Sequence, residues 1–196
     1  MKVRSPLLLL AALAATPGLA SAQAAAASPN PMGPPIPGIC LFARDAAIAN
    51  SKAGQATDAR LRQLGQTVQA ELAPEQQALI AENNALKTSA ATLPAAQRDQ
   101  RITALNTRAT AFNQKQQLRT AQLQATRTQA LEQILKPMDE ILGPISTSRR
   151  CSVVFERTTT YGFNTAMDLT PAVVQQMDAR MPTITFNLAT PESVRR

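Results

Sequence analysis

Residues 88–94 read Thr-Ser-Ala-Ala-Thr-Leu-Pro, and this short stretch decides how the chain folds. It carries no charge and breaks the apolar spacing on either side, and its proline suits the first turn of a new helix. The flanking sequence, from residue 45 to residue 148, is rich in Ala, Gln, Leu, Arg and Glu, which favour helix. The pattern therefore predicts two long helices, and the turn between them is the tip of a hairpin.

Apolar side chains recur along both helices at intervals of three and four residues, which is the spacing of a coiled-coil seam. The first helix carries Leu61, Leu64, Val68 and Leu72, and the second carries Ile102, Leu105, Ala109 and Phe112. Farther along, polar residues interrupt both series, which lowers stability while fixing the register. Pro74 and Pro137 are expected to kink the helices. The result is a long, thin arm that bends easily.

Strand patterns occupy the two ends of the chain. Gly38–Ala43 and Cys151–Arg157 are short apolar runs beside turn or charged residues, and each predicts a strand. Thr158–Phe163 is also rich in strand-forming residues, and Thr183–Leu188 alternates apolar and polar residues, as a last strand or an extended tail does. Between these two segments, Thr170 is the expected N-cap of a short helix.

Five of the six aromatic residues lie in these ends, so most large apolar side chains must pack outside the hairpin. The predicted fold class is α+β. Residues 38–44 and 149–190 form a small β-rich body, and residues 45–148 form a helical hairpin arm. A body of this size is marginal on its own and gains stability from self-association.

The N-terminal sequence has the three parts of a secretory signal peptide. Two basic residues precede an apolar run over residues 7–15, and residues 20–22 form an A-x-A cleavage pattern. The alternative, a retained membrane anchor, needs a longer run. We expect residues 1–22 to be removed on export and residues 23–37 to be a disordered Ala- and Pro-rich leader. We expect no transmembrane segment in the exported protein.

Cys40 and Cys151 are the two cysteines of the chain. In an oxidising compartment two cysteines most simply form one disulfide, and pairing of the two predicted strands would bring them within reach. Two buried free thiols are the alternative. The sequence has no C-x-x-C arrangement, so redox catalysis is not expected.

The composition excludes most catalytic chemistry. The chain has no histidine, which removes Ser-His-Asp catalysis, Cys-His catalysis and imidazole metal ligands. Two cysteines are too few for a four-thiolate zinc site, and no glycine-rich phosphate loop occurs. Glu71, Glu75 and Glu82 lie on one flank of the first helix and are interpreted as a solvated face. We expect no enzymatic activity, no cofactor and no bound metal.

Basic residues are concentrated on the second helix. Arg101, Arg108 and Lys115 repeat every seven residues and, with Arg119, form one stripe along a helix face. Such a stripe attracts anionic partners, namely acidic stretches of unfolded proteins, lipid headgroups or lipopolysaccharide. The alternative is a charged helix that only keeps the protein in solution. Nucleic acid is not an expected partner, because the sequence offers no aromatic stacking platform.

The order of these parts resembles that of the OmpH/Skp family of periplasmic chaperones. The resemblance rests on GICLFARDAAIANSKAG at residues 38–54, the helical hairpin, CSVVFERTTTYGF at residues 151–163 and MDLTPAVVQQMDARMP at residues 167–182. It implies a homotrimer in which strands from three chains form a central body. Three arms would then enclose a cavity that holds unfolded outer-membrane proteins without ATP.

Two other kinds of protein fit parts of the pattern. A periplasmic scaffold or adaptor would dock the hairpin against partner helices, but the arm has no continuous apolar outer stripe. A Spy-like, all-helical chaperone is suggested by LAPEQ at residues 72–76, which resembles one LTxxQ motif. The strand patterns at both ends disfavour this second alternative.

Overall fold

A computed structural model describes residues 32–194, so the predicted signal peptide and the first part of the predicted leader lie outside the described residues. The elements, in chain order, are β1 (Ile39–Phe42), α1 (Arg44–Asn50), α2 (Lys52–Ser89), α3 (Ala95–Ser148), β2 (Val153–Glu156), the 3-10 helices η1 (Arg157–Thr159) and η2 (Thr165–Met167), α4 (Thr170–Arg180) and α5 (Pro191–Val194). Two long helices and a two-stranded sheet confirm the predicted α+β class. The two strands do not fit the all-helical alternative.

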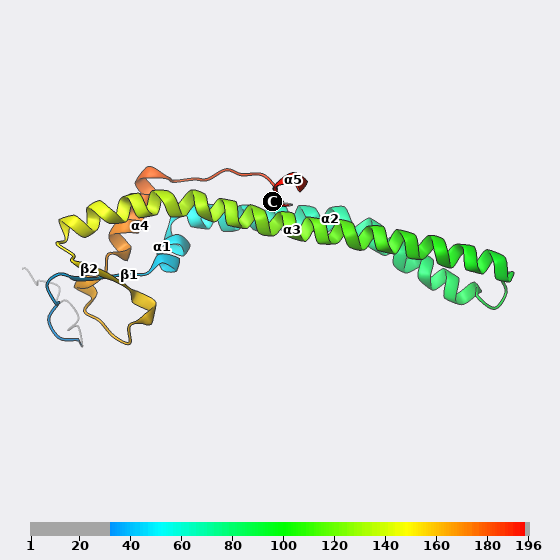
Figure 1. Ribbon diagram of the computed structural model, residues 1–196, viewed down its shortest axis with the longest axis horizontal. Helices are drawn as coiled ribbons and strands as arrows, with labels where there is room; N and C mark the ends of the chain where they lie inside the picture. Colours follow the sequence, from blue (N-terminus) through cyan, green and yellow to red (C-terminus); the bar gives the residue numbers. More distant parts are fainter. Residues whose placement is uncertain (1–31, 195–196) are drawn as a thin grey trace, which may run out of the picture. The chain divides into compact units, whose positions relative to one another are not determined.

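Helices α2 and α3 run side by side in opposite directions and form the arm (Figure 1). Residues 90–94 link them, inside the predicted turn. Both helices continue through their prolines, which are Pro74 in α2 and Pro137 and Pro144 in α3. Four seam residues are buried in the half of the arm next to the body: Leu64, Val68, Leu72 and Phe112.

The prediction of one helix running on from residue 45 is wrong at Ser51, where α1 ends and α2 begins. The Ser51 hydroxyl donates to the Ile48 carbonyl (2.9 Å) and accepts from the Gly54 N–H (3.1 Å), so it closes one helix and caps the next. Glycine is required at position 54, because a Cβ there would overlap the Ile48 carbonyl oxygen. The break lets the Lys52 N–H donate to Asp178 of α4 at 2.7 Å.

Strands β1 and β2 pair in parallel, with Ile39 opposite Val153. The second strand begins two residues later than predicted. Cys40 in β1 and Cys151, just before β2, are joined by a disulfide with a Cα–Cα distance of 5.7 Å. Because these residues flank the hairpin on its two sides, the sheet and the disulfide hold its base closed.

Helices contribute more of the core of the body than strands do. Its buried side chains are Cys40 and Phe42 of β1, Ala47 of α1, Ile134, Met138 and Ile141 of α3, Leu169, and Val173 and Met177 of α4. The last turns of α3 therefore lie in the body, although we expected residues 45–148 to form the arm alone. Two four-residue strands offer too little apolar surface for a core, and α3 supplies it at helical spacing.

Residues 158–163 do not form the predicted strand. The Glu156 side chain accepts hydrogen bonds from the Thr158 N–H (3.3 Å) and from the Thr158 hydroxyl (3.2 Å). The Thr159 hydroxyl donates to the Glu156 carbonyl at 2.9 Å. These local bonds compete with strand pairing and produce the 3-10 turn η1.

Helix α4 begins at Thr170, one residue earlier than predicted, so Thr170 is not its N-cap. Leu169 takes that position without a side-chain cap, and the Asp168 carboxylate accepts the Thr170 N–H at 2.9 Å in the turn that leads into the helix. The buried Thr170 hydroxyl instead accepts the Ala43 N–H at 2.9 Å. The threonine therefore ties the start of α4 to the end of β1.

The C-terminal tail, residues 183–190, is extended and pairs with no strand among the described residues. It runs back beside α3 to the short helix α5 (Figure 1). We expected this segment in the body, and most of it lies along the arm instead.

Residues 32–37, predicted to be disordered, run beside the loop before η2, where the Asn164 amide donates to the Gly33 carbonyl at 2.9 Å.

Candidate functional site

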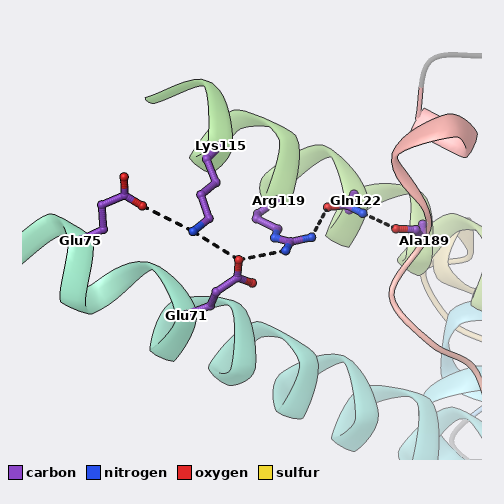
Figure 2. A network of polar contacts seen from close by, with 6 residues as sticks. All are labelled: Glu71, Glu75, Lys115, Arg119, Gln122 and Ala189. Atoms are coloured by element: carbon purple, nitrogen blue, oxygen red, sulfur yellow. Dashed lines mark hydrogen bonds and ion pairs between the residues drawn. The ribbon is translucent and has the colours of Figure 1, made fainter. Parts of the chain in front are cut away.

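The predicted basic stripe of α3 faces acidic residues of α2 across the arm. Arg119 donates to Glu71 at 2.9 Å, and the Lys115 ammonium lies 3.4 Å from both Glu71 and Glu75 (Figure 2). These carboxylates remain partly exposed, as expected of a solvated face, but they also form ion pairs across the arm that were not predicted. They are the partners of the stripe.

The pairing continues toward the tip in steps of one heptad. Arg108 pairs with Glu82, so both helices advance by seven residues from the Lys115 pair to the Arg108 pair. One further heptad brings Ser89 opposite Arg101. Accordingly, Arg101 makes no ion pair among the described residues, and the stripe divides into three paired cations and an open one near the tip.

The ion pairs set the electrostatics of this face. The hydrogen bond from Arg119 lowers the pKa of the Glu71 carboxyl below its ordinary value, and Lys115 acts in the same direction. The paired side chains are between 27% and 47% exposed, so solvent screens each pair and its contribution is modest. The positive charge of the stripe is balanced within the arm, which leaves Arg101 as its unpaired cation.

The polar network continues from Arg119 to the C-terminal tail (Figure 2). Arg119 donates to the Gln122 amide oxygen at 2.9 Å, and the Gln122 amide nitrogen donates to the Ala189 carbonyl at 2.5 Å. One turn along α3, the Thr126 hydroxyl accepts the Ala189 N–H at 2.8 Å. Gln122 and Thr126 are buried, and neither was predicted from the sequence. The available signal was a pair of polar residues one turn apart on the face that carries Ala130 and Ile134.

The outer part of the arm has no closed core. Over residues 73–111, no described side chain is fully buried. Ile80 is 54% exposed and Ile102, a predicted seam residue, is 39% exposed. The two helices therefore meet there through half-buried leucines and ion pairs.

The body exposes apolar side chains on its second strand. Val153, Val154 and Phe155 of β2 are 45%, 37% and 50% exposed, and nearby Tyr161 is fully exposed. Strand β2 pairs with β1 on one edge, and no other described strand lies on its second edge. That edge can accept a further strand.

Comparison with known protein families identifies a match for this fold. The family model "Outer membrane protein (OmpH-like)" matches residues 38–177, which include the sheet, the disulfide and the whole arm. The chain belongs to the OmpH-like family. The resemblance seen in the sequence is thereby confirmed.

A solved structure supports the OmpH-like assignment. A crystal structure from Caulobacter crescentus CB15, described as an OmpH-like outer membrane chaperone, is 35% identical to this chain with a TM-score of 0.72. The match covers 81% of this chain and 94% of that one. No curated protein matches the chain.

Three further properties of this OmpH-like chain bear on function. The family match ends inside α4, so the tail and α5 lie beyond it. Within residues 32–194, no three His, Cys, Asp or Glu side chains gather closely enough to hold a metal ion. No helix in that range has a stretch both long and apolar enough to cross a bilayer.

Proposed function

We propose that this chain is an ATP-independent holdase chaperone, exported to the periplasm, that keeps unfolded outer-membrane proteins from aggregating. The observation that carries the proposal is the outer arm, residues 73–111, whose described side chains all remain at least partly accessible. Membership in the OmpH-like family supports it, as does similarity to a structure described as an outer membrane chaperone.

The arm suits a client without fixed structure. An unfolded barrel strand exposes apolar residues at alternate positions and unpaired main-chain groups. Half-buried leucines such as Leu79, Leu86 and Leu105, interspersed with charged residues, offer many weak contacts. The sum of such contacts holds a client without one tight site. Release needs no energy source, because the client gains more by folding elsewhere.

The proposal includes assembly of three copies through the body. A two-stranded sheet is marginal on its own, and the exposed Val153 and Phe155 would be covered by strands of neighbouring copies. Three arms extending from one hub would enclose the client. In this arrangement the ion pairs of the basic stripe keep the two helices of each arm in register, and they do not hold the client.

Aggregation measurements test the holdase activity. An outer-membrane β-barrel protein, unfolded in urea, is diluted into buffer with a stoichiometric amount of trimer, and light scattering is followed. We expect scattering to be suppressed by this chain and not by an equal mass of a globular protein without such arms. Equal scattering in the two samples would refute the proposal.

A substitution on β2 tests the assembly. Phe155→Ser removes a half-exposed ring from the open strand, so the mass measured by light scattering should fall from three subunits toward one. Ile80→Ser removes an equally exposed apolar side chain from the arm and should leave the mass unchanged. A monomeric wild-type protein would rule out this mode of assembly.

A further inference from the structure

The C-terminal tail lies on the protein in the conformation of an isolated β-strand. Residues 183–188 alternate strictly: Ile184, Phe186 and Leu188 are partly buried, whereas the residue before each of them is exposed. Ile184 packs against the core of the body, and Leu188 packs against a separate cluster in the arm. The tail thus bridges the body and the arm with one side of an extended chain.

The surface that receives the tail combines apolar and polar residues of both arm helices. We call it the tail-docking face, and it consists of Arg60, Val68, Leu72, Phe112, Gln122 and Thr126. Val68, Leu72 and Phe112 form the buried cluster beside Leu188. The three polar residues of the face all bond to the tail.

Most of the polar contacts go to the main chain of the tail. Gln122 donates to the Ala189 carbonyl (2.5 Å), and Thr126 accepts the Ala189 N–H (2.8 Å). Arg60 donates through Nε to the Phe186 carbonyl at 3.2 Å. Its contact with the Asn187 side chain, at 3.3 Å, is an additional bond to a side chain. Because main-chain groups are common to every peptide, this mode of capture requires an extended backbone more than a particular sequence.

The burial of the polar residues fits a site built for a backbone. Gln122 is 2% exposed and Thr126 is 1% exposed. Buried polar groups need hydrogen-bonding partners, and the tail provides one to each residue, beside Arg119 for Gln122 and the Gln122 main-chain carbonyl for Thr126. A segment with apolar side chains at every second position can place one side on the cluster while its main chain bonds to Gln122 and Thr126.

We propose that the tail-docking face is a binding site for extended client segments with alternating apolar residues, and that the chain's own tail occupies it as an internal competitor. The inference rests on the proposed holdase function, since unfolded barrel strands have this pattern. The tail lies beyond the residues matched by the family model.

A peptide-binding experiment tests the inference. The probe is a fluorescently labelled peptide with the sequence of residues 182–190, Pro-Thr-Ile-Thr-Phe-Asn-Leu-Ala-Thr. A variant truncated after Met181 should bind it at least tenfold more tightly than the full chain, because the competitor is gone. A peptide with the same residues reordered so that Ile, Phe and Leu are adjacent should bind the truncated chain at least tenfold more weakly.

Substitutions in the tail-docking face provide a second test. Adding Gln122→Ala and Thr126→Val to the truncated chain should weaken binding of the probe at least tenfold, whereas adding Arg101→Gln should not. If circular dichroism shows that the truncated chain is unfolded, the full-length variant Ala189→Pro is used in place of the truncated chain. This variant loses the N–H that bonds to Thr126, so it should also bind the probe more tightly than wild type. Equal affinity of the two peptides, or no gain over wild type in the folded variant, would overturn the inference.

Client measurements separate this inference from the holdase proposal. With an unfolded barrel protein, the truncated chain should suppress aggregation at a lower concentration than the full chain, and excess probe peptide should reverse the gain. If no form suppresses aggregation, the holdase proposal fails. If all forms suppress it equally and the peptide has no effect, the holdase proposal stands and the client-binding role of the tail-docking face is wrong.

Discussion

Glu71 of α2 accepts a hydrogen bond from Arg119 of α3 at 2.9 Å, and the same carboxylate lies 3.4 Å from Lys115, one turn away. A single acidic side chain therefore joins two consecutive turns of the opposite helix. The pairs are partly exposed, and pairs of this kind contribute about 0–1 kcal/mol each. Their main effect is to select one register among the alternatives that a partly polar seam allows.

Glu71→Gln should destabilise the arm without unfolding the body. The amide keeps the shape of the side chain but loses its charge, so we expect the free energy of unfolding to fall by about 0.5–1 kcal/mol. Hydrogen exchange should accelerate in the outer arm and remain unchanged in α4. Arg101→Gln, on the same stripe but without an ion-pair partner among the described residues, is the matched control and should change neither quantity. Equal effects of the two substitutions would show that the ion pairs between α2 and α3 do not stabilise the arm.

The same carboxylate predicts a pH dependence. Arg119 lowers the pKa of Glu71 below the ordinary value of 4.5, so the folded state favours the ionised form. The stability that ionised Glu71 gives to the folded state is fully present above pH 4.5. It is lost as the pH falls through the lower pKa of the folded state. The stability difference between wild type and Glu71→Gln should therefore be constant at neutral pH and shrink in acid. A difference that grows on acidification would show that Glu71 is not paired.

The hairpin and its tip were predictable because their signals are local. Helix-forming composition and the uncharged stretch before Pro94 identify both helices and the turn from neighbouring residues alone. The ion pairs between α2 and α3 were not predicted, although the acidic flank of the first helix and the basic stripe of the second were both recognised in the sequence. Pairing depends on how the two helices are rotated and offset, and no single helix carries that information. The seven-residue repeat shared by the acidic and basic stripes was the available signal.

Contacts between distant segments account for the other differences. Thr170 has the residue type of an N-cap, yet its hydroxyl bonds to Ala43, which is distant in the sequence, and the helix begins at Thr170 itself with Leu169 before it. Gln122 and Thr126 resemble ordinary polar helix residues until the tail covers them. In each case a polar group is satisfied by a partner that the surrounding sequence does not reveal.

Gly54→Ala tests the break between α1 and α2. A Cβ at this position would overlap the Ile48 carbonyl oxygen, which is main chain and cannot move aside cheaply. Overpacking of this kind costs about 1–3 kcal/mol, so the melting temperature should fall and α1 should detach from α4. Gly65→Ala, in open space on the same helix, should instead stabilise the protein by up to about 1 kcal/mol. Calorimetry of both variants distinguishes a local clash from a general sensitivity of α2 to substitution.

Removal of the disulfide should open the base of the hairpin. Cys40 and Cys151 are 111 residues apart, so on the chain-entropy model their bond contributes about 4–5 kcal/mol. Cys40→Ser with Cys151→Ser should lower the free energy of unfolding by about that amount, measured at fixed protein concentration because assembly also stabilises the chain. Hydrogen exchange should accelerate in β1 and β2 and not at the tip. Reduction of the wild type should reproduce the effect, whereas two titratable thiols in the unreduced, denatured protein would contradict it.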